Sequence, residues 1–535
     1  MTAARHDSTA AGQAASPSRP ERTADDATLA AAFGALDAAQ AAGSGDMGPE
    51  AFRAAAHAVV DLMADYLAGV ERYAVLPSLE PGELRGRFPA HAPEEPEPLG
   101  RILADYRELV EPNITHWQHP GFFAYFASTA SAPGILGEML MATLIGNAML
   151  WRTSPVATEL EELTVGWLRD ALGLPDAFDG FYTDTASTSS LIGLAGARQA
   201  VAGRDASGEG LAERPQLRIY ASAEAHSSIE KAAMTLGLGR AGVVRVPVDQ
   251  EYRLDAGALE QSVARDRARG LVPCAIVATI GTTGSTSVDP VPALATIAER
   301  EGLWLHVDAA YAGATALLPE RRGPFAGWER ADSIVMNPHK WLFTPIDCSL
   351  FLTRRPETIR AAFRLVPDYL RTLDRSRPVH DYNEYIPQLG RRFRALKMWF
   401  LLRYFGLEGM RTRLRGHLEL ARRFASYVDA EPNAERLAPV TFSTVCFRWR
   451  PRHLRGREDE AEVAAGLDRL NTALMERVNR EGRIFISHTR LHDRLALRLS
   501  VGNLRTEARH VDRAWEAICA AGADLEHLVG TGSSA

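Results

Sequence analysis

Between residues 130 and 400, short apolar runs alternate with segments in which apolar residues recur at helical spacing. The apolar runs predict strands at residues 180–182, 217–221, 242–246, 275–280, 304–307 and 333–336. The helical spacing predicts helices at residues 159–172, 189–201, 228–236, 256–268 and 291–301. Several of the runs are apolar throughout, which is typical of strands covered on both faces. The alternation therefore predicts an α/β domain with a mostly parallel sheet, which binds ligands at the carboxyl ends of its strands.

The regions on either side of this domain follow other patterns. We expect four parts in the chain: an Ala-rich, disordered extension (1–46), a helical dimerisation segment (47–130), the large α/β domain (131–400) and a smaller α+β domain (401–535). Further helices are predicted at residues 27–42, 49–70, 99–110, 407–430 and 511–521, and further strands at 441–449, 483–486 and 495–501. The first two parts resemble a clamp or dimerising arm more than a catalytic module.

Charge and composition exclude some partners. The formal net charge is −7 and the sequence pI is about 6.1, so no basic excess is present to neutralise nucleic acid or an anionic membrane. The most apolar long stretch, residues 134–151, contains Glu138 and Asn147 and has helical periodicity, which favours a buried core helix over a membrane span. No apolar segment of a signal peptide follows the first 26 residues.

The four cysteines lie far apart without the spacing of a zinc site or a disulfide framework. We therefore expect no metal and a reducing, cytoplasmic location. Lysine is scarce: Lys231, Lys340 and Lys397 are the only three among the 60 lysines and arginines. A lysine that follows a buried-looking strand, as Lys340 does, invites a chemical explanation, because an amine can attack a carbonyl and a guanidinium cannot.

Small hydroxyl residues, carboxylates and histidines follow the other predicted strands. Thr185-Ala186-Ser187 opens a helix, where free N–H groups and hydroxyls can hold a phosphate. Asp308 ends one strand, Thr283 follows another, and His226 stands ahead of a helix. Taken singly, each of these residues also fits a structural role at a turn or helix cap. Together they supply a phosphate site, a carboxylate, an aromatic ring and an amine, which is the set that pyridoxal phosphate requires.

Several motifs carry a family resemblance that runs from about residue 48 to 528. HVDAAYAG (306–313) and NPHKW (337–341) resemble the group II pyridoxal-phosphate decarboxylases, specifically the aromatic L-amino-acid decarboxylases. The other matching segments are THWQHPGFFAYF (115–126), SPVATELE (154–161), AHSSIEKA (225–232), VATIGTTGST (277–286), FRLVPDYL (363–370) and LGRRFRALKMWF (389–400). The resemblance implies a fold type I enzyme that binds pyridoxal 5'-phosphate.

The resemblance also implies residue roles. Lys340 would bind the cofactor aldehyde, Asp308 would pair with the pyridine nitrogen, His226 would stack on the ring, and Tyr369 is a candidate proton donor. The remaining cofactor-binding residues would be Thr185, Ala186, Ser187, Thr283, Ala310, Asn337, His339 and, from a partner subunit, Gly390. The substrate pocket would be lined by Tyr125, Ser128, Asn147 and Met149. An obligate homodimer with its active site at the interface is implied.

Three functions stay open at the level of sequence. The first is decarboxylation of an aromatic L-amino acid to its amine and CO₂, or in a variant of this reading, of a non-aromatic amino acid. The second adds O₂ and gives an aldehyde, ammonia and peroxide; in the family a phenylalanine at the Tyr369 position or an asparagine at the His226 position accompanies that outcome, and neither is present here. The third is a catalytically silent homologue that serves as a binding or scaffold protein. The sequence does not name the preferred amino acid.

Overall fold

The structure is a computed structural model that describes residues 26–201, 206–212, 214–365 and 379–529. The chain forms two compact units. The first extends to His119 and includes Arg480–Arg483, and the second holds Pro120–Asn479 and the chain from Ile484 onward. The expected division differs, because residues 120–130 belong to the second unit and residues 401–535 are not a separate unit.

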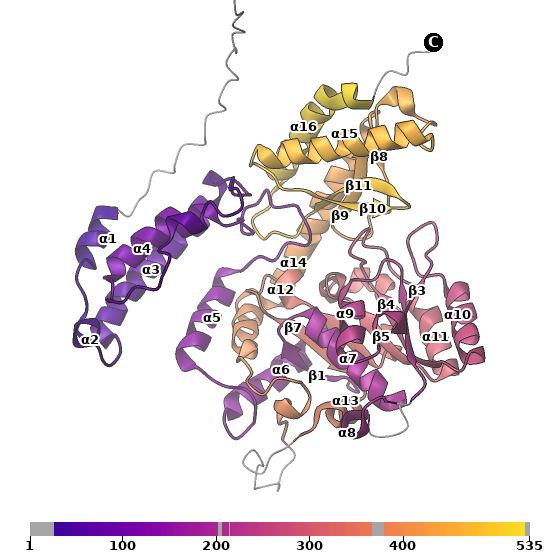
Figure 1. Cartoon of the computed structure of the whole chain (residues 1–535), viewed down its shortest axis with the longest axis horizontal. Helices are drawn as coiled ribbons and strands as arrows, with labels where there is room; N and C mark the ends of the chain where they lie inside the picture. The colour runs from indigo at the N-terminus through magenta and orange to yellow at the C-terminus, as the bar shows by residue number, and fades with distance from the viewer. Residues whose placement is uncertain (1–25, 202–205, 213, 366–378, 530–535) are drawn as a thin grey trace, which may run out of the picture. The chain divides into compact units, whose positions relative to one another are not determined.

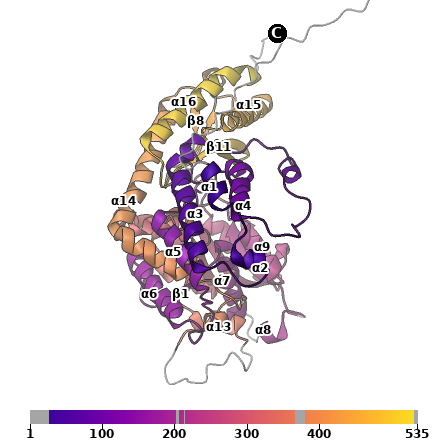
Figure 2. The same cartoon turned by 90° about the vertical axis from the view of Figure 1, so that its left-hand side faces the viewer.

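The first unit is helical. Its helices are α1 (Asp26–Ala32), α2 (Ala38–Ala42), α3 (Pro49–Gly69) and α4 (Leu99–Asp105), with α1, α3 and α4 side by side in Figure 2. The single helix expected at residues 27–42 is wrong. It is interrupted because the Asp37 carboxylate accepts hydrogen bonds from the backbone N–H groups of Ala39 and Gln40, which starts a new helix at Ala38.

The centre of the second unit is a seven-stranded sheet. Its strands are β1 (Asp179–Thr183), β2 (Leu217–Ser222), β3 (Val243–Val246), β4 (Val272–Thr279), β5 (Trp304–Asp308), β6 (Ser333–Met336) and β7 (Ser349–Thr353). They lie in the order β1-β7-β6-β5-β4-β2-β3, and β7 alone pairs antiparallel with its neighbours. The predicted mostly parallel sheet is confirmed. Strand β7 was missed because residues 337–348, which connect it to β6, contain only a single helical turn and not the long crossover helix that marks a parallel connection.

Helices cover both faces of this sheet (Figure 1). One face packs against α7 (Ala186–Val201), α9 (Ser228–Thr235) and α13 (Pro356–Phe363). The other packs against α6 (Pro155–Leu172), α10 (Ala256–Ala268) and α11 (Val291–Glu301). The strands between them are almost entirely buried, as their continuous apolar runs predict. This three-layer arrangement leaves the carboxyl ends of the strands as the place for a site.

A four-stranded antiparallel sheet follows in the same unit. Its order is β10 (Ser487–Leu491), β11 (Arg494–Ser500), β9 (Thr444–Trp449) and β8 (Ala434–Arg436), and it packs against α15 (Ala461–Arg480) and α16 (Ala508–Leu525). Helix α14 (Arg394–Ala430) contacts helices of both layers and runs across the expected boundary at residue 400 (Figure 2). The backbone of α14 is non-helical at Gly406 (φ 62°, ψ 168°), so the helix predicted at residues 407–430 begins after a kink and not at a domain boundary. The strand expected at 483–486 is wrong, because only Phe485 bridges there, to Phe122.

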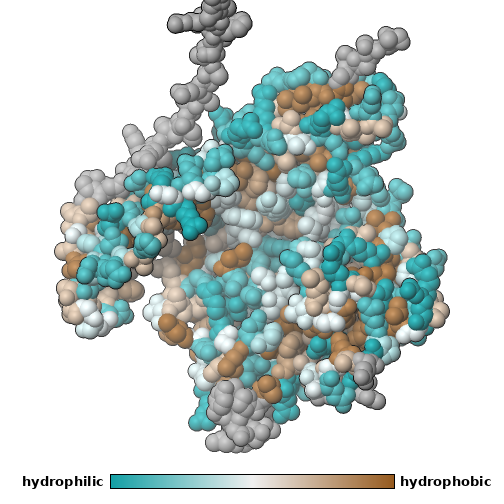
Figure 3. Space-filling view, viewed as in Figure 1, coloured by the Kyte–Doolittle hydropathy of each residue, from teal (hydrophilic) through white to brown (hydrophobic). Residues whose placement is uncertain are grey.

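Helix α5 (Ala132–Leu144) differs from the buried core helix expected at residues 134–151. It ends at Leu144, and its apolar side chains are largely exposed: Leu136 is 52%, Leu140 47% and Leu144 64% accessible. In Figure 3 the surface over α5 is largely apolar. The other face of the helix packs on α14, where Gly137 allows close approach to Lys397. Among the described residues, no helix is long and apolar enough to cross a membrane.

Candidate active site

A cavity of about 210 Å³ opens at the carboxyl ends of the parallel strands. Several strand ends contribute to its wall: β1 leads into α7, β5 ends at Asp308, and β6 leads into α12 (Pro338–Trp341). The wall consists of Phe126, Thr185, Ala186, Ser187, His226, Thr279, Gly281, Thr283, Asp308, Ala310, Tyr311, Asn337, His339 and Lys340. The cavity therefore brings together every cofactor residue predicted from the sequence except Gly390.

Lys340 supplies the amine of this cavity. Burial lowers the pKa of its ammonium group, and the nearby negative charge of Asp308 partly opposes that shift. Its Nζ lies 5.3 Å from the centroid of the Phe126 ring. A lysine whose pKa is lowered by burial loses its proton more easily, so Lys340 is suited to attack a carbonyl carbon.

Asp308 supplies a carboxylate at the end of β5. The side chain is buried, and its Oδ1 accepts a hydrogen bond of 3.0 Å from the backbone N–H of Ala310. Strand β5 lies between β4 and β6, so the position of the carboxylate is set by ladder pairing on both sides. A carboxylate held in this way can stabilise a positive charge in the cavity without a rearrangement of the backbone.

Two histidines face the cavity in their neutral form. The Nδ1 of His226 accepts from the backbone N–H of Ser228 at 3.2 Å, and the Nδ1 of His339 accepts from that of Cys348 at 3.0 Å. Each neutral ring therefore carries its proton on Nε2. Burial lowers the pKa of both rings, that of His339 to about 4. The two side chains can thus donate a hydrogen bond near neutral pH.

The N-terminus of α7 forms the hydroxyl-rich side of the cavity. Thr185, Ala186 and Ser187 stand at its first turn, where backbone N–H groups have no partner within the helix. The Asp184 carboxylate accepts a hydrogen bond from the Thr185 N–H at 2.6 Å. The helix start is thus held locally and presents small polar groups to the cavity, an arrangement suited to a phosphate.

A buried polar network fixes α7 against the sheet. The His306 ring lies between Ser190 of α7 (3.1 Å) and Ser333 of β6 (2.8 Å). Ser189, the preceding helix residue, lies 2.8 Å from the Thr183 hydroxyl and 3.0 Å from that of Ser349. These contacts join α7 to four strands, so the start of the helix and Asp308 keep a constant separation.

The donor set of the cavity fits pyridoxal phosphate. Asn337 and Thr279 line the cavity. The Oδ1 of Asn337 and the Oγ1 of Thr279 are buried and have no hydrogen-bond partner in the protein. Such atoms are costly unless a ligand or water satisfies them. A phosphate held at α7, an aldehyde at Lys340 and a ring nitrogen at Asp308 would use the polar groups that the protein leaves available.

Two aromatic residues of the wall were not singled out as site residues from the sequence. Phe126 stacks on Tyr311 with centroids 3.8 Å apart, and Tyr311 stacks on Trp341 at 4.5 Å. Both wall residues lie inside motifs of the resemblance, THWQHPGFFAYF and HVDAAYAG, which was the available signal. The stack gives the cavity a rigid apolar side.

A buried cation adjoins the same ring. Arg498 of β11 is 3% exposed, and its Cζ lies 5.3 Å from the Phe126 centroid. Its Nε donates to the Gly284 carbonyl at 2.8 Å, whereas Nη2 is buried without a partner. No sequence signal distinguished this arginine from the other 56, because its importance comes from its place next to Phe126.

The predicted substrate residues lie apart from the cavity wall. Tyr125 is 53% exposed and its N–H donates to the Ser487 hydroxyl, and Ser128 is half-buried. Asn147 is exposed and Met149 half-buried. Tyr369, the predicted proton donor, lies outside the described residues. One chain therefore brings the predicted cofactor residues together but not the predicted substrate residues.

Asn147, Met149 and Gly390 share one surface, which we call the platform (residues 147–150 and 389–391). The backbone N–H of Arg391 donates to Asn147 Oδ1 at 2.9 Å, and the N–H of Ala148 donates to the Arg391 carbonyl at 2.9 Å. Gly390 is exposed, with open space where a side chain would stand. The two segments are distant in sequence, and the platform exists only because they pair.

Comparison with known proteins gives matches along most of the chain. The profile of the pyridoxal-dependent decarboxylase conserved domain matches residues 81–450. Tyrosine decarboxylase 4 of Petroselinum crispum is 38% identical over 479 residues, which cover 88% of this chain and 93% of that protein. Phenylacetaldehyde synthase of Arabidopsis thaliana is 38% identical over 481 residues, which cover 88% and 96%.

A solved structure has the same fold. The crystal structure of Oryza sativa TDC with PLP and tryptamine superposes with a TM-score of 0.86 at 35% sequence identity, and covers 90% of this chain and 99% of that one. The predicted fold type I architecture, with its mostly parallel sheet flanked by helices, is confirmed by this likeness and by the strand order.

Proposed function

Because this chain belongs to the pyridoxal-dependent decarboxylases and uses pyridoxal phosphate as its cofactor, we propose that it converts an aromatic L-amino acid to the corresponding amine and CO₂. The observation that carries the proposal is the cavity in which Lys340 and Asp308 occupy neighbouring strand ends beside the start of α7. Relatives and structural neighbours that act on or contain tyrosine- and tryptophan-derived compounds support the aromatic class.

In this proposal the residues of the cavity divide the work. Lys340 would hold the cofactor aldehyde through its amine, which burial helps to deprotonate. Asp308 would hold a proton on the pyridine nitrogen, and the start of α7 would bind the phosphate. Pyridoxal phosphate, when bound, supplies an electron sink for the bond that breaks between Cα and the carboxylate.

Proton handling completes the reaction. Loss of CO₂ leaves an electron pair at Cα, which must take up one proton to give the amine. His226 carries a proton on Nε2 and faces the cavity, and it can position or relay that proton. The family resemblance implies Tyr369 as the donor of this proton. Phe126 and Tyr311 exclude water from the apolar side, which protects the electron pair from other reactions.

A second candidate is oxidative conversion of the same substrates to an aldehyde. It is favoured by the 38% identity to phenylacetaldehyde synthase of Arabidopsis thaliana. His226 and Tyr369 are the residues that accompany the decarboxylase outcome, so we place amine formation first. The two reactions differ in products: the oxidative one consumes O₂ and releases peroxide and ammonia in addition to the aldehyde.

We include in the proposal a homodimer whose active site lies at the interface. The exposed apolar side chains of α5 provide a face that a second copy can cover. Residues of the platform lie outside the cavity of their own chain and are available to that of a partner. A cytoplasmic location is also proposed, on the four cysteines, which are all unpaired.

Substitution of Lys340 tests the proposed function. The Lys340→Ala variant should lose the visible absorbance of bound pyridoxal phosphate and its turnover of tryptophan, tyrosine, DOPA and phenylalanine. Lys231→Ala is the matched control, because Lys231 is exposed on α9 and should leave both properties at wild-type level. The panel includes a non-aromatic amino acid, and amine, aldehyde and peroxide are measured together. Near wild-type turnover by Lys340→Ala would refute the assignment, and stoichiometric peroxide without amine would favour the second candidate.

A further inference from the structure

Arg391 and Glu161 form an ion pair from which water is excluded. Their side chains are 1% and 0% exposed, and Nη2 of the arginine lies 2.6 Å from Oε1 of the glutamate. Removing two charges from water is costly, and a pair of apolar side chains could fill the same volume without that cost. The pair is therefore better understood through the segments that it connects than through its own contribution to stability.

Arg391 connects both segments of the platform to the sheet. Its Nη1 donates to the Ala148 carbonyl at 2.9 Å, and its backbone N–H donates to Asn147 Oδ1 at 2.9 Å. Its Nη2 donates to the Tyr182 carbonyl of β1, also at 2.9 Å. One residue thus aligns the two segments with each other and fastens both to an edge strand.

Glu161 completes the attachment from α6. The same Oε1 that binds Arg391 accepts a hydrogen bond of 2.8 Å from the backbone N–H of Tyr182. Strand β1 continues from Tyr182 into Thr183 and the start of α7, the proposed phosphate site. The Arg391 guanidinium also lies over the Tyr382 ring, 4.4 Å from its centroid. The platform is therefore held by three elements, α6, β1 and the segment around Tyr382.

The platform presents residues that its own chain does not use. Gly390 and Asn147 are exposed, and neither they nor Met149 belongs to the cavity wall of the chain that carries them. A surface held so rigidly, and at the cost of a buried ion pair, has a fixed shape before anything binds to it. Such preorganisation is what a site completed by a second subunit requires.

We propose that Arg391 and Glu161 are a positioning pair that holds the platform in the shape in which it completes the cofactor cavity of a second copy of this chain. The proposal rests on the proposed function, because it requires a dimer with shared sites. Neither charged group lines the cavity, so both act through the platform and not on the reacting atoms.

The test removes the pair without leaving a buried charge. Arg391→Met alone would leave Glu161 ionised in the core, so the variant combines Arg391→Met with Glu161→Leu. Its KM for the amino acid and its Kd for pyridoxal phosphate should each rise about tenfold or more, because small displacements of positioning groups have large effects. The value of kcat at saturation should change much less.

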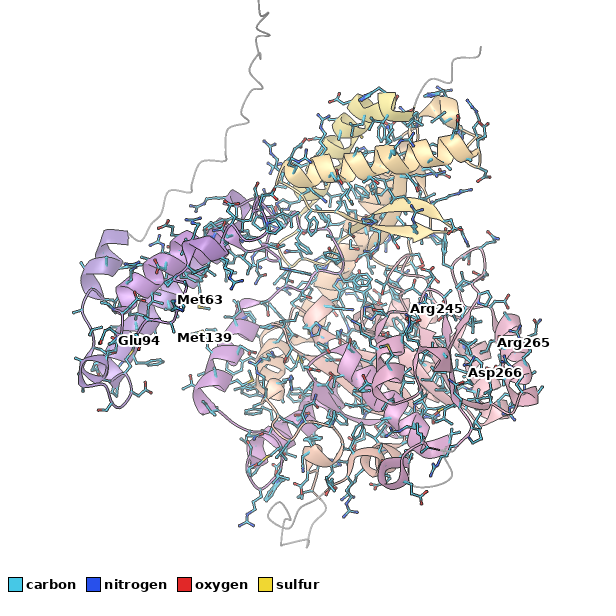
Figure 4. The ribbon with its side chains drawn as sticks, in the orientation of Figure 1. Met63, Glu94, Met139, Arg245, Arg265 and Asp266 are labelled. Atoms are coloured by element: carbon cyan, nitrogen blue, oxygen red, sulfur yellow. The ribbon has the colours of Figure 1, made fainter. Side chains whose placement is uncertain are left out.

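A matched control pair lies toward the other edge of the same sheet. Arg218 of β2 pairs with Asp266 of α10 at 2.9 Å, with side chains 15% and 7% exposed, and Asp266 is labelled in Figure 4. The Arg218→Met/Asp266→Leu variant removes a buried pair of the same chemistry that touches neither platform nor cavity. It should leave KM and the cofactor Kd unchanged, whatever its effect on thermal unfolding.

Mixed dimers separate positioning of the partner's site from a structural role. The Arg391→Met/Glu161→Leu chain, with Lys340 intact, is coexpressed with a Lys340→Ala chain whose platform is intact, and the heterodimer is isolated through two affinity tags. One of its two sites then has both parts, so at substrate well below KM it should show about half of the wild-type kcat/KM, together with one tight cofactor site. The reverse heterodimer carries all changes in one chain. One of its sites then lacks Lys340 and the other lacks an intact platform, so it should recover neither the kcat/KM nor the tight cofactor site.

A kcat/KM of the first heterodimer no higher than that of its parent homodimers would overturn the proposal, as would a kcat/KM near half of the wild-type value in the reverse heterodimer. An unaltered KM and cofactor Kd in the Arg391→Met/Glu161→Leu homodimer would overturn it as well. Failure of the proposed function is distinguishable: wild-type protein would then bind cofactor without forming amine. The cofactor titrations of the two heterodimers would still show whether the Arg391–Glu161 pair positions the platform, because only the first heterodimer should keep a tight cofactor site.

Discussion

The cavity and the platform differ in how much of a site one chain supplies. The cavity wall is assembled from consecutive strand ends of one sheet, and its amine, carboxylate and hydroxyls face a common space. The platform joins two segments more than 200 residues apart through Arg391, and its exposed residues do not line the cavity of their own chain. The reactive groups of the cavity lie together within one chain, whereas the platform residues lie outside the cavity in which those groups meet.

This difference suggests a division between reaction and selection. The groups that we expect to act on the cofactor are held by strand pairing and by the buried network under α7. Substitutions at the surface do not alter these interactions. Groups that we expect to contact the substrate side chain lie on surface segments, where substitution is tolerated more easily. The cofactor chemistry can thus stay constant while the preferred amino acid changes.

The largest effect expected on the cavity side comes from Asp308. Asp308→Asn keeps an acceptor for the Ala310 N–H but removes the negative charge, so kcat should fall about 10²- to 10³-fold. Steady-state amine formation measures the loss. Asp255→Asn, which keeps a cap at the start of α10, is the control and should retain full activity. Retention of activity by Asp308→Asn would remove the carboxylate from the proposed mechanism.

A charge on α5 tests whether the platform needs a second copy. Leu144→Asp places a carboxylate on the exposed apolar face, and an unpaired charge buried at an interface is strongly unfavourable. We expect dissociation to monomers, seen by sedimentation, with activity reduced about 10- to 100-fold at micromolar protein. Met234→Asp on α9, where the methionine is 55% exposed, is the control. A fully active Leu144→Asp monomer would mean that one chain completes its own site.

A smaller effect is expected from Met149 of the platform. Met149→Ala shortens a half-buried side chain without touching the cavity wall, so bound cofactor and its absorbance should be unchanged. The ratio of kcat/KM between tryptophan and tyrosine should shift by about tenfold, the usual scale of a changed apolar contact. Equal losses for all substrates would instead place Met149 in general support of the fold.

The smallest expected effect is a difference in pH dependence: histidines near the cavity and near the platform should change local stability in opposite directions as the pH falls. Burial lowers the pKa of His306 and His339 from 6.5 to about 4, so stability that is present above pH 6.5 is lost as the pH falls toward 4. Near the platform, a hydrogen bond to Glu162 raises the pKa of His380, so its stabilisation is present below pH 6.5 and is lost as the pH rises.

Hydrogen exchange at pH 6 and pH 8 checks these opposite signs. At pH 6, amides around β5 and α12 should exchange faster, because each buried histidine costs about 1 kcal/mol there. Amides of residues 379–391 should exchange more slowly at pH 6 than at pH 8 once the intrinsic rate is corrected. Asp289, whose carboxyl pKa burial raises to about 7, opposes the histidines at the end of β4. The same sign in both regions would contradict the comparison.

Much of the catalytic half of the molecule could be predicted from local pattern. Strands β1 to β6 and the helices between them follow apolar runs and helical spacing, since each element buries a continuous stretch of the chain. The residues after those strands meet because parallel strands end at one edge. Strand β7, the exposure of α5 and the crossing of residue 400 by α14 depend on packing between distant segments, which local periodicity does not record.

By itself, the sequence determined the α/β order and, through its motifs, the family, and it predicted which residues at the strand ends would bind the cofactor. Only the tertiary structure decided that Phe126 and Arg498 adjoin the cavity, that Gly390 and Asn147 share a platform, and that Arg391 pairs with Glu161. The physical reason is the distance along the chain over which the interactions act. Strands and helix caps depend on neighbours a few residues away, whereas burial of a charge and the shape of a surface depend on which distant segments exclude water from each other.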